Sequence, residues 1–299
     1  MTETAGVANP AAWIRSVTVV GLGVMGGSVA KAVARRAPAV PVFGVEPDTG
    51  SAREAARDGV HLAGDLGECR LNGGVVVFAA PLDKTVALVR ETAAVWSKAA
   101  LATDVASLKV PVLEAAGRGG GGGVFVGAHP MCGSERSGYA AARGDLFEGA
   151  RVWLCPGDGV GGGDAAGTAG RGSAAGRATA FWNLLGARPV TIAAERHDRL
   201  MAWASHLPQL LGSALAAALD EAGVRHEMLG PGGTDMTRLA GSSPEMWSPA
   251  FDAAAAEDAR ALRSMEAQIA GLRRALERRD IGAVEAIMTR GRRWTATKA

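Results

Sequence analysis

The segment SVTVVGLGVMG, residues 16–26, joins an apolar run rich in β-branched residues to three glycines spaced as G-x-G-x-x-G. The run Ser16–Val20 predicts a buried strand, and the Ala-rich stretch Ser28–Arg36 beyond the glycines predicts a helix. Glycines at such a strand-to-helix turn let the backbone approach a pyrophosphate, which then lies at the helix N-terminus. The segment therefore predicts a dinucleotide-binding βαβ unit near the start of the chain.

An acidic residue follows the second expected strand, Pro41–Val45. Glu46 lies 20 residues beyond Gly26, where a carboxylate accepts hydrogen bonds from ribose hydroxyls and repels a 2′-phosphate. Because Glu46–Gly50 contains no Arg or Lys, we expect NAD rather than NADP as the cofactor. The alternative is a structural glycine turn with an unrelated surface glutamate. The residues expected to bind the cofactor are Gly21, Gly23, Val24, Met25, Gly26, Glu46 and Pro81.

Short apolar runs alternate with helical stretches through the first 193 residues, as in βαβ units. Further strands are expected at Val75–Ala79, Leu101–Asp104, Val124–Ala128, Arg151–Leu154 and Arg188–Ile192. Further helices are expected at Ser51–Asp58, Lys84–Trp96, Val110–Ala116 and Ala174–Leu185. Two glycine-rich tracts, Gly117–Gly123 and Gly157–Gly176, predict flexible surface loops. The expected fold class is α/β, with an N-terminal Rossmann-like, doubly wound parallel sheet.

The sequence changes character after Ala193. Strand-like runs end, and stretches rich in Ala, Leu, Arg and Glu predict helices at Arg199–Ala222, Asp252–Arg279 and Ile281–Trp294. A segment rich in Gly, Pro and Ser, Gly230–Pro249, interrupts them. We therefore expect an NAD-binding domain at residues 1–193 and an all-helical domain for substrate binding and dimerisation at residues 194–299. Such a helical unit commonly buries its apolar face against a second copy, so a homodimer is expected.

Composition argues against several classes of protein. The chain of 299 residues is 48% hydrophobic and 21% charged, which is ordinary for a globular protein. Its net charge of +2 disfavours nucleic acid as a partner. No apolar run is long enough to span a bilayer, and the first ten residues lack a signal sequence, so no membrane attachment is expected. Three widely spaced cysteines predict no metal site and fit a reducing compartment, so the expected location is the cytoplasm.

Two segments place polar residues directly after expected strands, where an open α/β sheet binds its ligands. The first, Asp104–Lys109, contains Ser107, whose alternative role is a helix N-cap. The second, Gly127–Gly138, carries His129 at the end of a strand. An imidazole there, beside a dinucleotide, is a candidate proton acceptor. The alternative is a histidine with a purely structural role.

A third group of polar residues lies in the helical part, within Ser205–Gln209 and Thr234–Trp247. Arg238 stands in a neutral, apolar stretch, which suggests a guanidinium held for a carboxylate ligand. The alternative is an ion pair with Asp235, three residues earlier on the same helix.

Together these segments resemble the prephenate/arogenate dehydrogenase family of tyrosine biosynthesis. The resemblance extends from Val17 to about Met288 and is most specific in FVGAHPMCGSERSGYAAARGDLF, residues 125–147. The segments SHLP and TDMTRLAGSSPEMW, which begin at Ser205 and Thr234, follow in the family's order. The resemblance implies oxidative decarboxylation of a cyclohexadienyl carboxylate, either prephenate or arogenate. Hydride would pass to NAD, and the product would be 4-hydroxyphenylpyruvate or tyrosine.

The resemblance also implies roles for individual residues. His129 resembles the catalytic acceptor at the substrate's ring hydroxyl, and Ser107 resembles the residue that orients His129 and the nicotinamide. Arg238 resembles the anchor for a substrate carboxylate, and Glu135 resembles an acidic residue that gates the pocket. The residues expected to bind substrate are Arg238, His206, Gln209, Glu135 and Ser134.

The identity of the substrate stays open because many members carry a second histidine where this chain has Gln209. A 4-amino-4-deoxyprephenate dehydrogenase of secondary metabolism is therefore an alternative. The chain ends with the helical part, so no appended amino-acid-sensing or mutase domain is expected.

Two other classes of protein with a dinucleotide-binding sheet are alternatives for this chain: β-hydroxyacid dehydrogenases and NAD-binding redox sensors. β-Hydroxyacid dehydrogenases use a lysine on the first long helix of their helical part, and Arg199–Ala222 contains no lysine. A non-catalytic, NAD-binding redox sensor would not need His129, Ser107 and Arg238. A hydride-transfer assay distinguishes that sensor from an enzyme.

Overall fold

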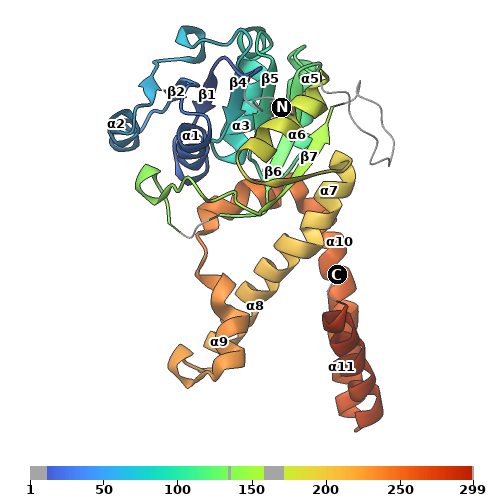
Figure 1. The fold of residues 1–299 in the computed structure, drawn as a ribbon. Coiled ribbons are helices and arrows are strands. Elements are labelled where there is room, and N and C mark those ends of the chain that lie inside the picture. Colours follow the sequence, from blue (N-terminus) through green and yellow to red (C-terminus); the bar gives the residue numbers. More distant parts are fainter. Residues whose placement is uncertain (1–11, 134–135, 158–171, 298–299) are drawn as a thin grey trace, which may run out of the picture. The chain divides into compact units, whose positions relative to one another are not determined.

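The computed structural model describes residues 12–133, 136–157 and 172–297 (Figure 1). By their internal contacts they form two compact units. The sheet unit comprises the chain up to Met201 together with Ser242–Ala253. The helical unit comprises Ala202–Gly241 and the chain from Ala254 onward. It stays a prediction that residues 1–193 bind NAD and that residues 194–299 bind substrate and form the dimer.

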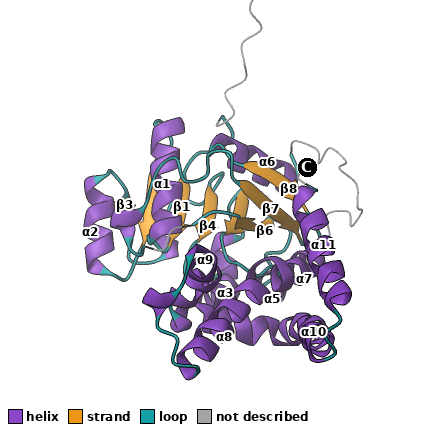
Figure 2. Cartoon of the chain, turned by 90° about the horizontal axis from the view of Figure 1, so that it is seen from below, coloured by secondary structure: helices purple, strands orange, loops and turns teal. Residues whose placement is uncertain are grey.

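The sheet unit is built on eight strands in the order β3-β2-β1-β4-β5-β6-β7-β8 (Figure 2). Strands β1 to β6 are parallel, and their order reverses at β1, which confirms the Rossmann-like prediction. The carboxyl ends of these six strands meet at one edge of the sheet. The strands are β1 (Val17–Val20), β2 (Val42–Val45), β3 (His61–Leu62), β4 (Val75–Phe78), β5 (Leu101–Asp104), β6 (Phe125–Pro130), β7 (Arg151–Pro156) and β8 (Arg188–Thr191).

The sheet departs from the parallel arrangement at β7, which runs antiparallel to β6. A parallel crossover needs a long connection, usually a helix. Among the described residues between β6 and β7, the helical structure is a single 3-10 turn, Tyr139–Ala141. Helix α6 (Ala174–Leu184) joins β7 to β8, and these two strands are parallel.

Seven helices belong wholly to the described part of the sheet unit. They are α1 (Val24–Arg36), α2 (Thr49–Arg57), α3 (Leu82–Glu91), α4 (Ala93–Trp96), α5 (Val110–Arg118), α6 and α7 (Ala194–Met201). The helix expected at Lys84–Trp96 is divided at Thr92, whose hydroxyl donates to the Leu88 carbonyl. Such back-bonding by threonine competes with the helical hydrogen bonds.

The expected glycine-rich loops are only partly loops. Gly117 is still helical, and Gly121 is buried because it packs against Trp96. Of the second tract, residues 158–171 lie outside the described residues. Its last residues belong to α6, because the Ser173 hydroxyl accepts the Gly176 N–H and caps the helix.

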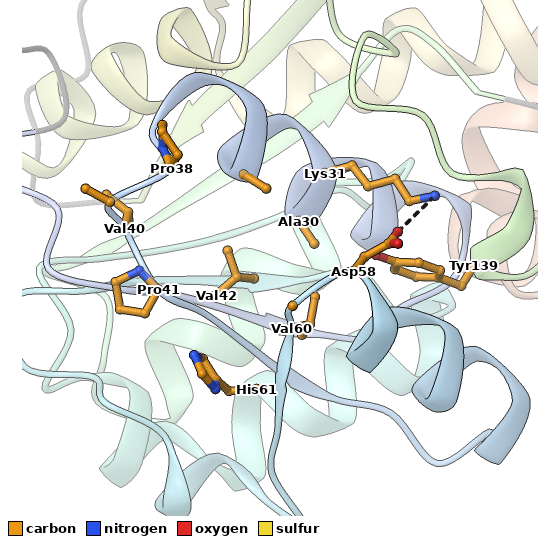
Figure 3. Close-up of a pocket in the computed structure, with 13 residues that line it drawn as sticks. Ala30, Lys31, Pro38, Val40, Pro41, Val42, Asp58, Val60, His61 and Tyr139 are labelled. Atoms are coloured by element: carbon orange, nitrogen blue, oxygen red, sulfur yellow. Dashed lines mark hydrogen bonds and ion pairs between the residues drawn. The ribbon is translucent and has the colours of Figure 1, made fainter.

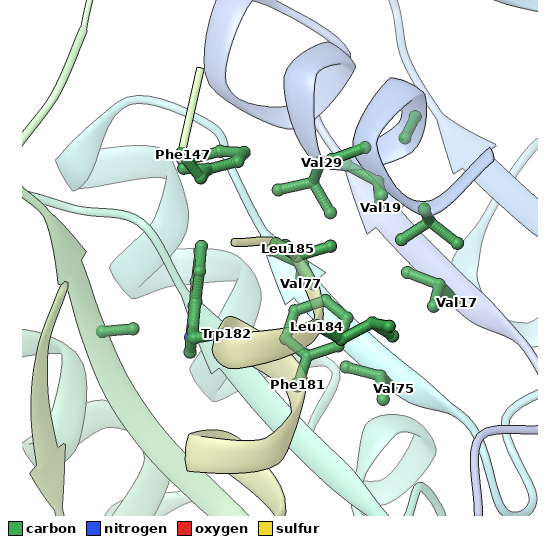
Figure 4. Packing of buried hydrophobic residues seen from close by; sticks show 14 of the residues in the cluster. Val17, Val19, Val29, Val75, Val77, Phe147, Phe181, Trp182, Leu184 and Leu185 are labelled. Atoms are coloured by element: carbon green, nitrogen blue, oxygen red, sulfur yellow. The ribbon is translucent and has the colours of Figure 1, made fainter. Parts of the chain in front are cut away.

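Both faces of the sheet are covered by helices. Alternate residues of β4 point to opposite faces: Val75 and Val77 join one buried cluster, whereas Val76 and Phe78 join the other. The first cluster also takes in apolar side chains of α1 and α6, including Trp182 (Figure 4). Figure 2 shows α3 and α5 on the other side of the sheet. Each fully buried valine or phenylalanine stabilises this arrangement by about 1.5–3 kcal/mol.

The described part of the helical unit contains helices and turns, which confirms the prediction of a helical second part. It contains a π-turn (Ala202–His206), α8 (Leu207–Glu221), α9 (Pro231–Thr237), most of α10 (Pro244–Glu277) and α11 (Ile281–Ala296), with 3-10 turns at His226–Met228 and Arg238–Gly241. No described helix is both long and apolar enough to cross a membrane.

The expectation that Gly230–Pro249 is irregular is wrong. This segment contains α9 and the start of α10. Pro231 and Pro244 occupy the first position of these two helices, where a proline costs no hydrogen bond and its fixed φ favours the helix. The same residues that predicted a loop therefore begin helices.

Candidate active site

The glycine turn after β1 has one open position and two crowded ones. Gly21 has φ +92°, and a Cβ there would lie 2.9 Å from the backbone of Ala79. A Cβ at Gly26 would lie 1.9 Å from the Gly21 carbonyl oxygen and 2.9 Å from Val19. At Gly23 nothing lies within 4 Å of a Cβ. Gly21 and Gly26 thus close the turn against the sheet, while Gly23 leaves space for a ligand.

That space adjoins the N-terminus of α1, which begins at Val24. Among the described residues no side chain caps this end, and the first turn of α1 carries no acidic residue. The first N–H groups of a helix and its dipole favour an anion. The residues at this turn, including half-buried Val24 and Met25, therefore fit a pyrophosphate.

Glu46 is tied to the same turn. Its Oε2 accepts the Leu22 N–H at 2.5 Å, and its Oε1 accepts the Asp48 N–H at 2.8 Å. The half-buried carboxylate is thereby held at the carboxyl end of β2, next to the glycine turn. Pro81 lies at the same edge of the sheet, where it is exposed at the N-cap of α3 after β4.

His129 lies near the end of β6 and is half-buried. Its Nδ1 is 3.0 Å from Nε2 of His197, a fully buried residue of α7. Nδ1 of His197 is in turn 2.7 Å from Oδ1 of Asp198. The Asp198 carboxylate also accepts the N–H groups of Lys109 (2.8 Å) and Val110 (2.9 Å) at the start of α5.

A buried ion pair fixes the backbone just before His129. Lys109 Nζ donates to Asp104 and to the Ala128 carbonyl at 2.7 Å, and Asp104 Oδ1 accepts the Ala128 N–H at 2.9 Å. Burial raises the pKa of the Asp104 carboxyl, and the Lys109 ammonium together with the N–H groups of Ala128 and Ala106 opposes that rise. With both oxygens so engaged, Asp104 is poorly suited to accept a proton from a substrate.

Ser107 lies half-buried in the loop between β5 and α5. Its alternative role as a helix N-cap is wrong, because the N-cap position of α5 belongs to Lys109. Asp198, from α7, binds the first N–H groups of α5 in place of a local cap. Ser107 and His129 thus both lie at the carboxyl edge of the parallel strands, as do Gly21 and Glu46.

The remaining expected substrate residues belong to the helical unit. His206 is buried, and its Nδ1 lies 2.9 Å and 3.1 Å from the two carboxylate oxygens of Asp258. Gln209 is buried on α8 and donates from Nε2 to the Leu239 carbonyl at 2.8 Å. Arg238 is exposed at the first position of the 3-10 turn that contains Leu239. Gln209 therefore holds the turn that carries Arg238.

Two expected residues, Ser134 and Glu135, lie outside the described residues. A cavity of about 550 Å³ occurs elsewhere, beside α1 and the start of β2 (Figure 3). Lys31, Asp58 and Tyr139 line it, and Lys31 Nζ lies 3.5 Å from the Asp58 carboxylate. It lies at the amino end of β2 and includes none of the residues expected to bind cofactor or substrate.

Comparison with known families decides what these two units are. The nucleotide-binding domain of prephenate dehydrogenase matches residues 29–166, and the dimerization domain of prephenate dehydrogenase matches residues 193–290. The chain belongs to the prephenate dehydrogenase family.

Individual proteins support this membership. The chain is 29% identical over 245 residues to a prephenate dehydrogenase of Bacillus subtilis (strain 168), which covers 78% of this chain and 62% of that protein. It is 26% identical over 243 residues to a cyclohexadienyl dehydrogenase of Zymomonas mobilis, with 78% of each chain covered. The chain thus spans a little under two thirds of the length of the Bacillus relative.

A solved structure shares the fold. A prephenate dehydrogenase from A. aeolicus, in complex with hydroxyphenyl propionate and NAD+, has a TM-score of 0.81 at 22% identity. The likeness covers 95% of this chain and 99% of that one. At this identity it supports the fold of the prephenate dehydrogenase family.

Sequence analysis missed His197 and Asp198. The only signal was a pair of titratable residues in AERHDRL, directly after the last strand. We expected a helix to begin at Arg199, which left this pair in a connection. In the structure α7 already begins at Ala194, and this helix carries both residues.

Proposed function

We propose that this member of the prephenate dehydrogenase family oxidatively decarboxylates a cyclohexadienyl carboxylate, prephenate or arogenate, with NAD as hydride acceptor. The observation that carries the proposal is the position of His129. Its imidazole stands at the carboxyl edge of a dinucleotide-binding sheet, hydrogen-bonded through Nδ1. The names of the Bacillus and Zymomonas relatives support the same class of reaction.

The cofactor assignment rests on the glycine turn and on Glu46. NAD, when bound, accepts the hydride. The open side of Gly23 and the uncapped α1 N-terminus suit its pyrophosphate, and the Glu46 carboxylate suits ribose hydroxyls rather than a 2′-phosphate. The A. aeolicus structure, which is described with NAD+, supports this choice.

His129 acts as the proton acceptor. Hydride leaves C4 of the cyclohexadienyl ring, and the ring hydroxyl gives up its proton to His129 as the C4–O bond gains carbonyl character. The ring carboxylate departs as CO2, and its electron pair completes the aromatic ring. His129 then returns the proton to the phenolic oxygen. The buried pair of Asp104 and Lys109 holds the backbone of Ala128, directly before His129. We assign Ser107 to orienting the imidazole, as the family resemblance implies.

Substrate recognition is assigned residue by residue. We assign Arg238 to a substrate carboxylate, and His206 and Gln209 to substrate binding. Ser134 and Glu135 complete the proposed set. The match to a dimerization domain supports a homodimer formed through the helical unit.

The test is an NAD-reduction assay of the purified protein with prephenate, arogenate and 4-amino-4-deoxyprephenate in parallel. We expect NADH and CO2 in equal amounts from prephenate or arogenate. His129→Asn should lower kcat by about 10²- to 10⁴-fold and leave NAD affinity unchanged. Turnover of the amino compound alone would favour the alternative substrate. Tight NAD binding without turnover of any of the three would favour a redox sensor.

A further inference from the structure

We propose that His197 and Asp198 act with His129 as a hydrogen-bonded chain that fixes the His129 tautomer and balances the charge when His129 takes up a proton. This inference rests on the proposed function in one respect, namely that His129 is the proton acceptor. His197 and Asp198 are positioning residues, because they act through His129.

The chain of hydrogen bonds starts from Asp198. Its carboxylate accepts the N–H groups of Lys109 and Val110 at the start of α5, where the helix dipole favours a negative charge. An ionised carboxylate can only accept hydrogen bonds. Nδ1 of His197, 2.7 Å from Oδ1 of Asp198, must therefore be the protonated nitrogen that donates.

The tautomer of His129 follows from that of His197. A neutral His197 protonated at Nδ1 has a bare Nε2, which can only accept. The His129 Nδ1, 3.0 Å away, must then carry a proton and donate it. The lone pair of His129 is left on Nε2, the nitrogen that the proposed reaction requires as a base.

Burial strengthens the hydrogen bonds that connect Asp198, His197 and His129. His197 is fully buried, and only 13% of the Asp198 side chain is exposed. Hydrogen bonds and charges interact more strongly in such surroundings than in water. When His129 becomes an imidazolium, it still donates from Nδ1 to Nε2 of His197, and the Asp198 carboxylate compensates the positive charge.

The other titratable groups around His197 add little net charge. Asp104 and Lys109, packed from β5 and the start of α5, form a neutral ion pair. Cys155 on β7 stays a neutral thiol, because burial raises its pKa to about 12. Glu195, on α7 itself, is exposed. Among the described residues, Asp198 is therefore a negative charge well placed to balance a protonated His129.

Asp198→Asn is the sharpest test, because asparagine keeps the size of the side chain and can present a donor to Nδ1 of His197. With its amide nitrogen at the position of Oδ1, it donates to His197 and no longer accepts the Lys109 N–H, while its carbonyl oxygen at the position of Oδ2 still accepts the Val110 N–H. His197 would then be protonated at Nε2 and would donate to His129, whose base would move from Nε2 to Nδ1. We expect kcat to fall by about 10²- to 10⁴-fold, with the KM for NAD unchanged.

The matched control is Glu195→Gln, which removes an exposed carboxylate from the same helix and should leave kcat unchanged. Thermal unfolding of both variants shows whether either effect reflects loss of fold. Asp198→Asn with kcat within about threefold of the unmodified protein would overturn the proposal.

A second measurement needs no substrate. Nitrogen-15 NMR of the unmodified protein at neutral pH reports which ring nitrogen of each histidine is protonated. We expect Nδ1 in both His129 and His197, and Nε2 in both after Asp198→Asn. A His129 protonated at Nε2 in the unmodified protein would overturn the proposal. If none of the three substrates is turned over, the proposed function fails. The spectra still show whether His129 and His197 have the tautomers that the hydrogen bonds to Asp198 require.

Discussion

At the scale of single residues, Gly23 and Gly26 of one turn should respond differently to the same added methyl group. Gly23 has an extended backbone with open space at its Cβ, so Gly23→Ala should fold normally. Its methyl group would occupy the space assigned to the pyrophosphate, and NAD affinity should fall by at least ~10-fold. Isothermal titration measures the affinity. Unchanged affinity would mean that the cofactor does not approach the turn at Gly23.

Gly26→Ala is the companion variant. Its Cβ would lie 1.9 Å from the Gly21 carbonyl oxygen, so strand and helix must move apart. We expect a loss of about 1–3 kcal/mol in the free energy of unfolding. Urea unfolding of the two variants separates the structural effect from the loss of cofactor binding.

Glu46 should set the preference for NAD over NADP. A carboxylate repels a 2′-phosphate, so we expect kcat/KM to favour NAD by at least ~10-fold, about 1.4 kcal/mol. Glu46→Ser should narrow that ratio. Because Glu46 also accepts the Leu22 N–H, Glu46→Gln is the control that removes the charge and keeps an oxygen acceptor. Equal kcat/KM values for NAD and NADP in the unmodified protein would contradict the assignment.

The three cysteines should react slowly in the folded protein. Burial raises the pKa of all three thiols, that of Cys132 to about 11 and that of Cys155 to about 12. Since the thiolate is the reactive form, raising the Cys132 pKa from 9.0 to about 11 lowers the thiolate fraction at pH 8 about 100-fold. Alkylation of Cys132 by iodoacetamide should therefore accelerate about tenfold per pH unit up to about pH 10.

Mass spectrometry of the labelled peptides follows each cysteine separately, and the same chain in urea serves as the control. All three should be labelled rapidly in urea. Labelling of native Cys132 as fast as in urea would show that its thiol is neither buried nor shifted.

At the scale of elements, the packing of α8 against the Arg238–Gly241 turn links the helix to Arg238, the proposed anchor of a substrate carboxylate. Gln209→Ala removes the donor to the Leu239 carbonyl and should destabilise this contact by about 1–3 kcal/mol. Because the turn carries Arg238, we expect a higher KM for the cyclohexadienyl substrate and an unchanged KM for NAD. Steady-state kinetics measures both.

Glu221→Gln is the matched control for Gln209, since Glu221 lies exposed at the end of the same helix and should not affect either KM. Gln209→His restores an N–H donor and should recover part of the affinity. A Gln209→Ala protein with an unchanged substrate KM would show that the turn holds Arg238 without this hydrogen bond.

The elements that sequence analysis predicted well are those whose signal is local. The buried runs at Val17–Val20 and Val75–Phe78 are apolar apart from Thr18, because both faces of a parallel sheet are covered. The direction of β7 could not be predicted in this way, since its residues look the same whichever way the strand runs. The direction depends on the connection from β6, which has no long helix among its described residues.

In the candidate site too, residues with a local sequence signal could be predicted, and contacts that depend on the fold could not. His129 could be recognised from its place at a strand end. Its partner His197 lies 68 residues away in sequence, and only the fold brings the two rings within hydrogen-bond distance. The pairing of Asp104 with Lys109 lies within one short segment, but its contact with Ala128 depends on where β5 and β6 separate.

At the scale of the whole molecule, α11 indicates how the protein assembles. The helix has 16 residues and none of them is buried. An isolated helix of this length is marginal in water, so tertiary or quaternary contacts must stabilise it. Its apolar residues Ile281, Val284 and Met288 fall on one side at helical spacing, and Ile281 and Met288 are 55% and 68% exposed.

A helix with such an exposed apolar stripe fits an interface between two copies of the chain. We expect sedimentation equilibrium to show a dimer at micromolar concentration. Met288→Glu places a charge within the stripe and should raise the dimer dissociation constant by at least ~100-fold, about 2.7 kcal/mol. Ala286→Glu adds the same charge on the opposite side of α11 and should leave the dimer intact. A monomeric unmodified protein, or equal effects of the two variants, would show that α11 gains its stability elsewhere.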